Sequence, residues 1–318
     1  MKWKKLGKIF DPTEHKLSND CIEFAQSPQT LVFDNFVRIY FSTRKKDADS
    51  GKFLSHISFI DMDKGFKKIV NISSKTVIEL GGLGTFDEHG IFPINPLRVK
   101  DKIMAYTCGW SRRVSVSVET STGLAFSDDN GLTFKKHGTG PIFSSALHEP
   151  FLVGDSFVQI YEDVYHMWYI YGVRWTDHEG EESAARVYKI AHATSDDGIS
   201  WKRDGKQLII DKLNVDECQA LPTVIHHKNK YHMLFCYREA TGFRKNSERA
   251  YRIGYAWSDD LLNWTRDDDH VGIGVSENSW DSSMLCYPHM FHCNGNVYLL
   301  YNGNEFGRFG FGLAVLED

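Results

Sequence analysis

The sequence predicts an all-β fold, a five-bladed β-propeller formed by residues 1–318 as a single domain. Two repeated signatures and a relation between the two ends of the chain support this prediction. No long stretch shows the 3.6-residue periodicity of an amphipathic helix. The aromatic content of 14% suits an all-β core, and it equally suits stacking against sugars.

The first signature is a Ser-Asp-Asp turn that begins at residues 127, 195 and 258. An apolar, strand-like segment precedes each turn, and an aromatic residue with basic neighbours follows it. Asp-Asn-Gly and Asp-Asp-Gly favour tight turns with positive φ, so each unit is expected to be a β-hairpin. The acids Asp128, Asp196 and Asp259 are therefore interpreted as structural.

The second signature is an acid, a short gap, a proline, an apolar strand, a polar turn and an aromatic-rich strand. It occurs at residues 19–28, 86–93, 148–150, 215–222 and 280–288, and five of the 8 prolines belong to it. Those prolines are Pro28, Pro93, Pro150, Pro222 and Pro288. Five units of ~64 residues each leave room for four strands per unit. The expected blades are 20–80, 81–143, 144–210, 211–274, and 275–318 together with 1–10.

The two ends of the chain complement each other. The fifth unit stops after about three strands. The segment that starts at Trp3-Lys4-Lys5 resembles Trp201-Lys202-Arg203, which begins a fourth strand. The N-terminal strand should therefore complete the last blade, close the ring and remove its open edge.

Charge and cysteine usage narrow the function classes. The net charge is −5 and no basic run occurs, which argues against nucleic acid as a partner. No apolar run reaches the ~18 residues of a membrane span, and the N-terminus lacks the pattern of a signal peptide. The 6 cysteines form no C-x-x-C pair, so we expect buried free thiols and a cytoplasmic location. No motif indicates a cofactor, and the 14 histidines form no close metal-ligand pair.

Five units with acids at the start of their inner strands resemble the five-bladed β-propeller glycosidases, which include arabinanases, xylosidases, invertases, levansucrases and mannoside phosphorylases. The resemblance implies that inner strands deliver acids to a central pocket. Glu149-Pro150 matches the acid-proline pattern of that superfamily, and Glu217-Cys218 resembles the Glu-Cys pair of invertases. Ser27-Pro28 departs from the pattern, because a catalytic Asp would be expected before that proline.

Cleavage of a glycosidic bond requires a proton donor and a second carboxylate. We assign Glu217 as the general acid and Glu149 as the second carboxylate or the group that tunes its pKa. Asp20, or else Asp87, is the expected base, and Glu23 and Glu88 lie close by in the sequence. The alternative is a structural loop role for the acids that recur in the same phase, namely Asp20, Asp87, Asp216 and Asp281.

Expected substrate contacts follow the second strand of several units: Arg44, Trp110, Arg174, Trp175 and Arg238. Glu88 is a further candidate, and His148 could orient a substrate hydroxyl. Arginine forks bind hydroxyls, carboxylates and phosphates, so an anionic or phosphorylated sugar is one interpretation, and charge balance against nearby acids is the other.

The sequence therefore predicts a carbohydrate-active protein, with glycoside hydrolysis as the first hypothesis. A phosphorylase or a sugar transferase is the alternative, favoured by the arginines and by Ser27. A propeller that binds sugar without catalysis is the third.

Overall fold

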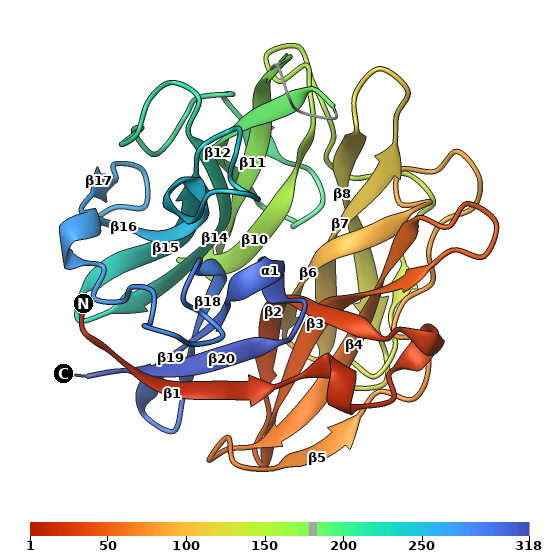
Figure 1. The fold of residues 1–318 in the computed structure, drawn as a ribbon, viewed down its shortest axis with the longest axis vertical. Coiled ribbons are helices and arrows are strands. Elements are labelled where there is room, and N and C mark those ends of the chain that lie inside the picture. The colour runs from red at the N-terminus through yellow and green to blue at the C-terminus, as the bar shows by residue number, and fades with distance from the viewer. Residues whose placement is uncertain (178–182, 318) are drawn as a thin grey trace.

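The computed structural model describes residues 1–177 and 183–317, which are almost entirely β-strand (Figure 1). The prediction of an all-β fold is confirmed. The strands form three four-stranded sheets and one eight-stranded sheet. Helical segments are single short turns, and within the described residues no helix is long and apolar enough to cross a membrane.

The eight-stranded sheet consists of two consecutive groups of strands. The first group comprises β2 (Glu23–Val32), β3 (Phe36–Lys46), β4 (Phe53–Asp63) and β5 (Ile69–Ile72). The second comprises β6 (Gly90–Val99), β7 (Lys102–Arg112), β8 (Val118–Ser127) and β9 (Lys135–Lys136). Among the described residues, the only strand pairing between the two groups is a parallel bridge between Ser55 and Gly90.

Two of the four-stranded sheets follow in chain order. One contains β10 (Val153–Tyr161), β11 (Val164–Thr176), β12 (Ala185–Ser195) and β13 (Lys202–Arg203). The other contains β14 (Cys218–His227), β15 (Lys230–Arg238), β16 (Arg252–Ser258) and β17 (Thr265–Arg266). The chain also has four short helical turns: η1 (Pro12–Glu14) and η2 (Ser18–Asp20) precede β2, η3 (Ser247–Arg249) lies between β15 and β16, and η4 (Asp268–His270) follows β17.

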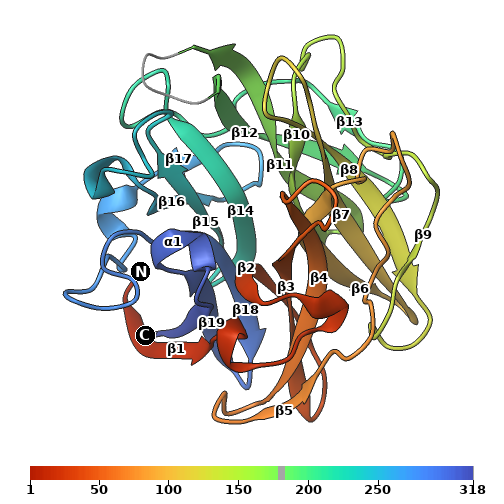
Figure 2. The same cartoon turned by 45° about the vertical axis from the view of Figure 1, so that its right-hand side comes forward.

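The last sheet joins the two ends of the chain. It contains β18 (Cys286–Cys293), β19 (Asn296–Asn302) and β20 (Phe311–Leu316), with the turn α1 (Asn304–Gly307) between the last two. The N-terminal strand β1 (Trp3–Phe10) pairs antiparallel with β20, from Trp3 opposite Leu316 to Phe10 opposite Phe311. Both termini therefore lie side by side (Figure 2), and the predicted exchange of the N-terminal strand is confirmed.

The first strand of each group lies innermost (Figure 1). These strands contact one another in the cyclic order β2, β6, β10, β14, β18 and back to β2. Apolar side chains fill the space between neighbouring sheets, as with Phe10, Phe41 and Phe311, which pack together with ring centroids 5.1–5.9 Å apart. All six cysteines are free and buried, as expected.

The Ser-Asp-Asp turns are structural, as predicted, but the acid that fixes each turn is the second one and not the predicted Asp128, Asp196 or Asp259. In each turn the serine hydroxyl contacts the second acid, as between Ser195 and Asp197 at 2.9 Å. The carboxylate of Asp197 accepts the backbone N–H groups of Ile199 and Ser200. These hydrogen bonds hold its pKa at about 2, so the turn is fixed by a stably ionised side chain.

Each innermost strand is interrupted at the same point by a bulge. Regular pairing lapses between Gln26 and Gln29, Ile91 and Ile94, Gly154 and Phe157, Ala220 and Thr223, and Cys286 and His289. The first residues skipped are Ser27, Phe92, Asp155, Leu221 and Tyr287. Four of them have positive φ, and Phe92 instead precedes a cis proline. Bulges of this kind re-aim a side chain, and here they do so at the centre of the molecule.

The bulges correct one element of the second signature. Pro28, Pro93, Pro222 and Pro288 all occupy the second skipped position. The third unit has Ser156 there, and Pro150 lies in the loop before β10. The acid-proline pair at residues 149–150 is therefore out of phase with the other four units, and the residue in phase is Asp155.

Candidate functional site

A cavity of about 590 Å³, which we call the central cavity, lies where the innermost strands begin. Each of those strands contributes to its wall, through Gln26, Phe92, Asp155, Ala220 and Tyr287. The bulged segments therefore form the floor of the cavity. Sites of this kind commonly combine an apolar lining with a few convergent polar groups.

The polar lining is dominated by arginine. Five arginines line the central cavity, against only two carboxylates, Asp155 and Glu305; the arginines are Arg44, Arg186, Arg238, Arg244 and Arg308. Arg308 pairs with Glu23 at 2.7 Å and with Glu305 at 3.2 Å. The other four make no ion pair with any carboxylate of the described residues. Burial and then neighbouring arginines hold the pKa of Arg244 below its usual range. An excess of positive charge in a partly desolvated cavity favours an anionic ligand.

Aromatic rings provide much of the remaining lining and hold several of these arginines in place. The Arg44 guanidinium lies 4.7 Å from the centre of the Phe24 ring, and that of Arg238 lies 3.6 Å from Phe243. The other rings in the wall are Phe53, Phe92, Trp110, Tyr188, Tyr251, Tyr287 and Phe306. Flat rings beside charged forks suit a ligand that has both apolar faces and polar edges.

Arg238 is fixed from several sides. It donates hydrogen bonds to the carbonyl of Glu239 at 2.6 Å and to the hydroxyl of Tyr188 at 2.8 Å. The Tyr188 hydroxyl in turn shares a hydrogen bond of 2.7 Å with that of Tyr251. This network gives the cavity a preorganised cation, since little side-chain freedom remains to be lost on ligand binding.

Asp155 is the buried carboxyl of the central cavity, with 8% of the residue exposed. Its backbone lies in the bulge of β10, with φ of 50°. Burial raises its pKa to about 7, although Arg186 and the backbone N–H of Leu221 oppose the change. A carboxyl group with that pKa is partly protonated near neutral pH and can donate a proton.

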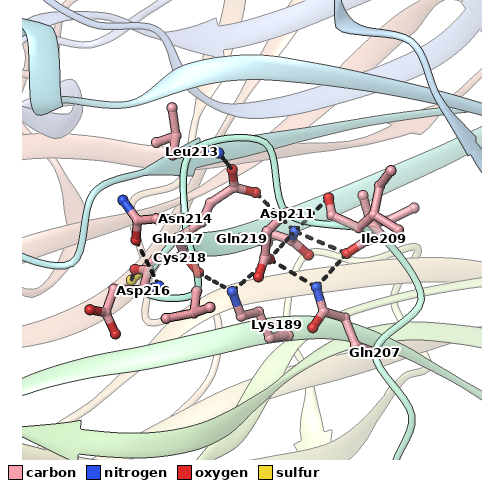
Figure 3. Close-up of polar contacts among 12 residues, drawn as sticks. Lys189, Gln207, Ile209, Asp211, Leu213, Asn214, Asp216, Glu217, Cys218 and Gln219 are labelled. Carbon is pink, nitrogen blue, oxygen red and sulfur yellow. Dashed lines mark hydrogen bonds and ion pairs between the residues drawn. The ribbon is translucent and has the colours of Figure 1, made fainter.

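The structure places Glu217 elsewhere, in an ion pair with Arg266 inside its own sheet. Figure 3 shows Glu217 beside Leu213 and Gln219. Its carboxylate accepts hydrogen bonds from Arg266 at 2.6 Å, from Gln219 at 2.9 Å and from the backbone N–H groups of Lys212 and Leu213. Burial raises the pKa of Glu217, but these donors outweigh burial and hold the pKa below its ordinary value. Glu217 does not line the central cavity.

The same arrangement recurs in four of the five strand groups. In each, a buried acid just before the innermost strand pairs with a basic residue on the outermost strand. The pairs are Asp87 with Lys136 on β9, Glu149 with Arg203 on β13, Glu217 with Arg266 on β17, and Asp281 with Lys5 on β1. Glu149 additionally accepts a hydrogen bond of 2.5 Å from the Tyr169 hydroxyl. The aromatic-basic strands of the first signature therefore supply cations to the acids of the second.

The remaining predicted residues divide into two sets. Arg44, Trp110 and Arg238 line the central cavity. The others do not: Arg174 pairs with Asp216, Trp175 is half-buried next to it, Glu88 accepts the backbone N–H of Gly84 at 3.0 Å, and Asp20 and His148 are exposed. The structure thus does not bring Glu149, Glu217, Asp20 and Asp87 together in one cavity.

The described residues contain no group of three or more His, Cys, Asp or Glu side chains arranged to hold a metal ion. A second hollow of about 700 Å³ lies beside β12 and β13, with Trp264, His192 and Lys206 in its wall. Arg203, the partner of Glu149, also lines it, but no predicted site residue does.

Comparison with solved structures identifies the class of fold. A structure described as a glycoside hydrolase aligns with a TM-score of 0.73 at 16% identity, covering 99% of this protein and 93% of that one. The β-1,2-mannobiose phosphorylase from Listeria innocua, in complex with β-1,2-mannobiose, aligns with a TM-score of 0.67 at 13% identity, covering 98% and 96%. The chain therefore shares the fold of these solved glycoside hydrolase and mannobiose phosphorylase structures, as the sequence motifs predicted.

Sequence relatives place the chain more narrowly. The chain belongs to the family of the uncharacterized Mycobacterium tuberculosis proteins MT1551 and Rv1502, each 32% identical over 319 residues that cover 100% of both chains. It is also 34% identical to the β-1,2-mannobiose phosphorylase of Thermoanaerobacter sp. (strain X514) over 85 residues, 26% of each chain. No family model matches the sequence.

Proposed function

We propose that this chain is a glycoside-cleaving enzyme, a single five-bladed propeller of residues 1–318 in which Asp155 donates the proton to the leaving oxygen. The observation that carries the proposal is the environment of Asp155, a buried carboxyl with a pKa of about 7 in a cavity lined by arginines and aromatic rings. The cyclic contacts of the five innermost strands, with β1 completing the last sheet, support five blades and a closed ring.

The reaction follows from that assignment. The bond between the anomeric carbon and the glycosidic oxygen breaks, and the Asp155 proton moves to that oxygen. In hydrolysis the oxygen of a water molecule bonds to the anomeric carbon and loses a proton to a base. The arginines support a substrate that carries negative charge, in the form of an anionic or phosphorylated saccharide. The free, buried cysteines support a reducing compartment, and we propose the cytoplasm.

Phosphorolysis is the second candidate. Among the residues described, Asp155 is the only buried carboxyl in the central cavity, and Glu305 is exposed. Orthophosphate would need no base, because it already carries negative charge, and the arginines that form no ion pair with the described residues could bind it. The partial similarity to a mannobiose phosphorylase also favours this candidate.

For Glu149, Glu217 and Asp87, the buried ion pairs support a structural role in place of the predicted catalytic one. For Glu217, the Arg266 guanidinium and the backbone N–H groups keep the pKa below its ordinary value, so it is a poor proton donor at neutral pH. Asp20 lies outside the cavity lining and has no observation in its favour.

The test is a screen of aryl glycosides and an oligosaccharide panel, neutral and anionic, with and without orthophosphate. The wild-type chain should cleave at least one of them. Asp155→Asn should lower kcat by about 10²–10⁴-fold, the usual contribution of a general acid, while Glu217→Gln should retain turnover under conditions in which it is folded. Dependence on orthophosphate would identify phosphorolysis.

Two outcomes would overturn the proposal. Full activity of Asp155→Asn would remove Asp155 from the chemistry. Absence of turnover across the panel, together with thermal stabilisation by a particular sugar, would indicate a propeller that binds carbohydrate without cleaving it.

A further inference from the structure

The segment that connects β15 to β16 carries two residues into the central cavity, Phe243 and Arg244. The base of this segment is internally bonded. Arg249 donates hydrogen bonds to the carbonyl of Thr241 at 2.8 Å and to its hydroxyl at 3.2 Å, and the backbone N–H of Lys245 bonds to the carbonyl of Gly242. Hydrogen bonds within the segment therefore hold the residues that flank the tip at 243–244.

The tip contacts α1 of the neighbouring sheet at the wall of the cavity. The Arg244 guanidinium lies 5.1 Å from the centre of the Phe306 ring, and the rings of Phe243 and Phe306 meet edge to face at 6.0 Å. Phe306 belongs to α1 of the neighbouring sheet, and Gln26 anchors it by donating to its carbonyl at 2.7 Å. Among the described residues, Phe243 and Arg244 contact α1 through ring contacts and form no hydrogen bond with it.

The charges around Arg244 oppose that position. Burial, and then the nearby Arg238 and Arg186, hold the pKa of Arg244 below its usual range. No carboxylate of the described chain forms an ion pair with it. Repulsion between like charges in a cavity of reduced dielectric favours displacement of the tip. A bound anion turns this net repulsion into attraction, because it attracts the guanidinium groups of Arg244, Arg238 and Arg186 at once.

We propose that Arg244 determines the selectivity of this cavity for a negatively charged ligand, and that a bound oxyanion holds the 243–244 tip against Phe306. The recognised chemistry is a carboxylate or phosphate oxyanion, whether it belongs to the saccharide or is free phosphate. This rests on the proposed function, since the saccharide would occupy the same cavity. Closure is driven by differential affinity, because the ligand binds the closed tip more tightly than the open one.

The test measures binding without turnover, in the Asp155→Asn background, with orthophosphate, glucuronate, glucose 6-phosphate and glucose as probes. Calorimetry gives affinity, and hydrogen–deuterium exchange of residues 242–246 reports the tip. At least one anionic probe should bind and slow exchange there, while glucose should do neither. Arg244→Ala should weaken anion binding by about tenfold or more, as expected for a charge-assisted hydrogen bond, and should abolish the protection.

The control is Arg98→Ala. Arg98 is an exposed arginine at the other end of β6 that packs over Phe33, outside the central cavity, and its loss should leave both readouts unchanged. If orthophosphate binds and neither glucuronate nor glucose 6-phosphate does, the recognised anion is free phosphate. Equal affinity of the Arg244→Ala variant, or equal protection by glucose, would overturn the inference. Cleavage is not measured here, so failure of the Asp155 assignment is recognised separately.

Discussion

Asp155 and Glu217 are both buried carboxyl groups near the start of an innermost strand, but their surroundings differ. Glu217 has a guanidinium at 2.6 Å and two backbone N–H donors, and its pKa lies below the ordinary value. Asp155 has no ion pair within the described residues, and burial raises its pKa to about 7. Burial alone therefore does not determine the pKa of a carboxyl group, because a paired cation can outweigh it and keep the group ionised.

This difference separates carboxylates that stabilise the sheets from one that can react. Asp87, Glu149 and Asp281 share the environment of Glu217, each with a cation from the outermost strand of its own group. The ion pair joins the entry of a sheet to its outer edge. Asp155 forms no such ion pair with the described residues, and its ionisation lowers the stability of the fold. Such a cost is typical of functional groups.

The largest expected effect on stability is that of Asp155→Asn, and it depends on pH. Because the folded-state pKa is raised, wild-type stability should fall as the pH rises from about 4 to about 7, while the variant lacks this loss. Each pH unit between the ordinary and the raised pKa contributes about 1.4 kcal/mol to this loss. The unfolding free energy of the variant should therefore exceed that of wild type by an amount on the order of 4 kcal/mol at pH 8 and by almost nothing at pH 4. Urea unfolding at both pH values measures this.

If the stability difference between Asp155→Asn and wild type were the same at pH 4 and pH 8, the Asp155 carboxyl would ionise at little cost. The contrast with Glu217 would then disappear. A matched measurement on Asp129→Asn provides the control, because Asp129 lies in an exposed Ser-Asp-Asp turn and its pKa is lowered. Asp129→Asn should be less stable than wild type above pH 4, the opposite of the change expected for Asp155→Asn.

Glu217→Gln should have the next largest effect, a loss of unfolding free energy. Removing one partner of a buried ion pair costs ~3–5 kcal/mol, and the lower end applies because Arg266 keeps Asp268 at 3.0 Å. The folded-state pKa is lowered from 4.5, so the stabilisation is present above that pH and is lost as the pH falls below it. The deficit of the variant at pH 7 should therefore shrink at pH 3.

Urea unfolding at the two pH values measures this prediction. A Glu217→Gln chain as stable as wild type at pH 7, but inactive, would restore Glu217 to the chemistry and would reverse the roles assigned to the two carboxyls.

Much of the fold follows from the sequence because turns and repeats are local. The Ser-Asp-Asp hairpins need only a few neighbouring residues, and the resemblance of the segment at Trp3 to that at Trp201 suffices to place β1 beside β20. The arrangement of the five innermost strands follows from repeat length and short connections.

The site was harder to predict, because its residues are defined by bulges and not by motifs. The distance from the entry acid to the first skipped residue is six residues for Asp281 and Glu149, five for Asp87 and four for Glu217, so spacing alone does not locate Asp155. The proline at residue 150 pointed to Glu149 instead. Arg186 and Arg244 carry no sequence signal, since β12 and the segment after β15 reach the cavity only through the tertiary fold.

The smallest expected effect is that of Glu305→Gln, which separates burial from pairing. Glu305 has a cation partner, Arg308 at 3.2 Å, but 56% of its side chain is exposed. Solvent screens such a pair and the side chains lose entropy in forming it, so the midpoint of urea unfolding should stay within error of wild type. A loss as large as that of Glu217→Gln would mean that a cation partner alone makes a carboxylate structural. An unchanged midpoint would show that the acids at the sheet entries stabilise the fold because they are both buried and paired.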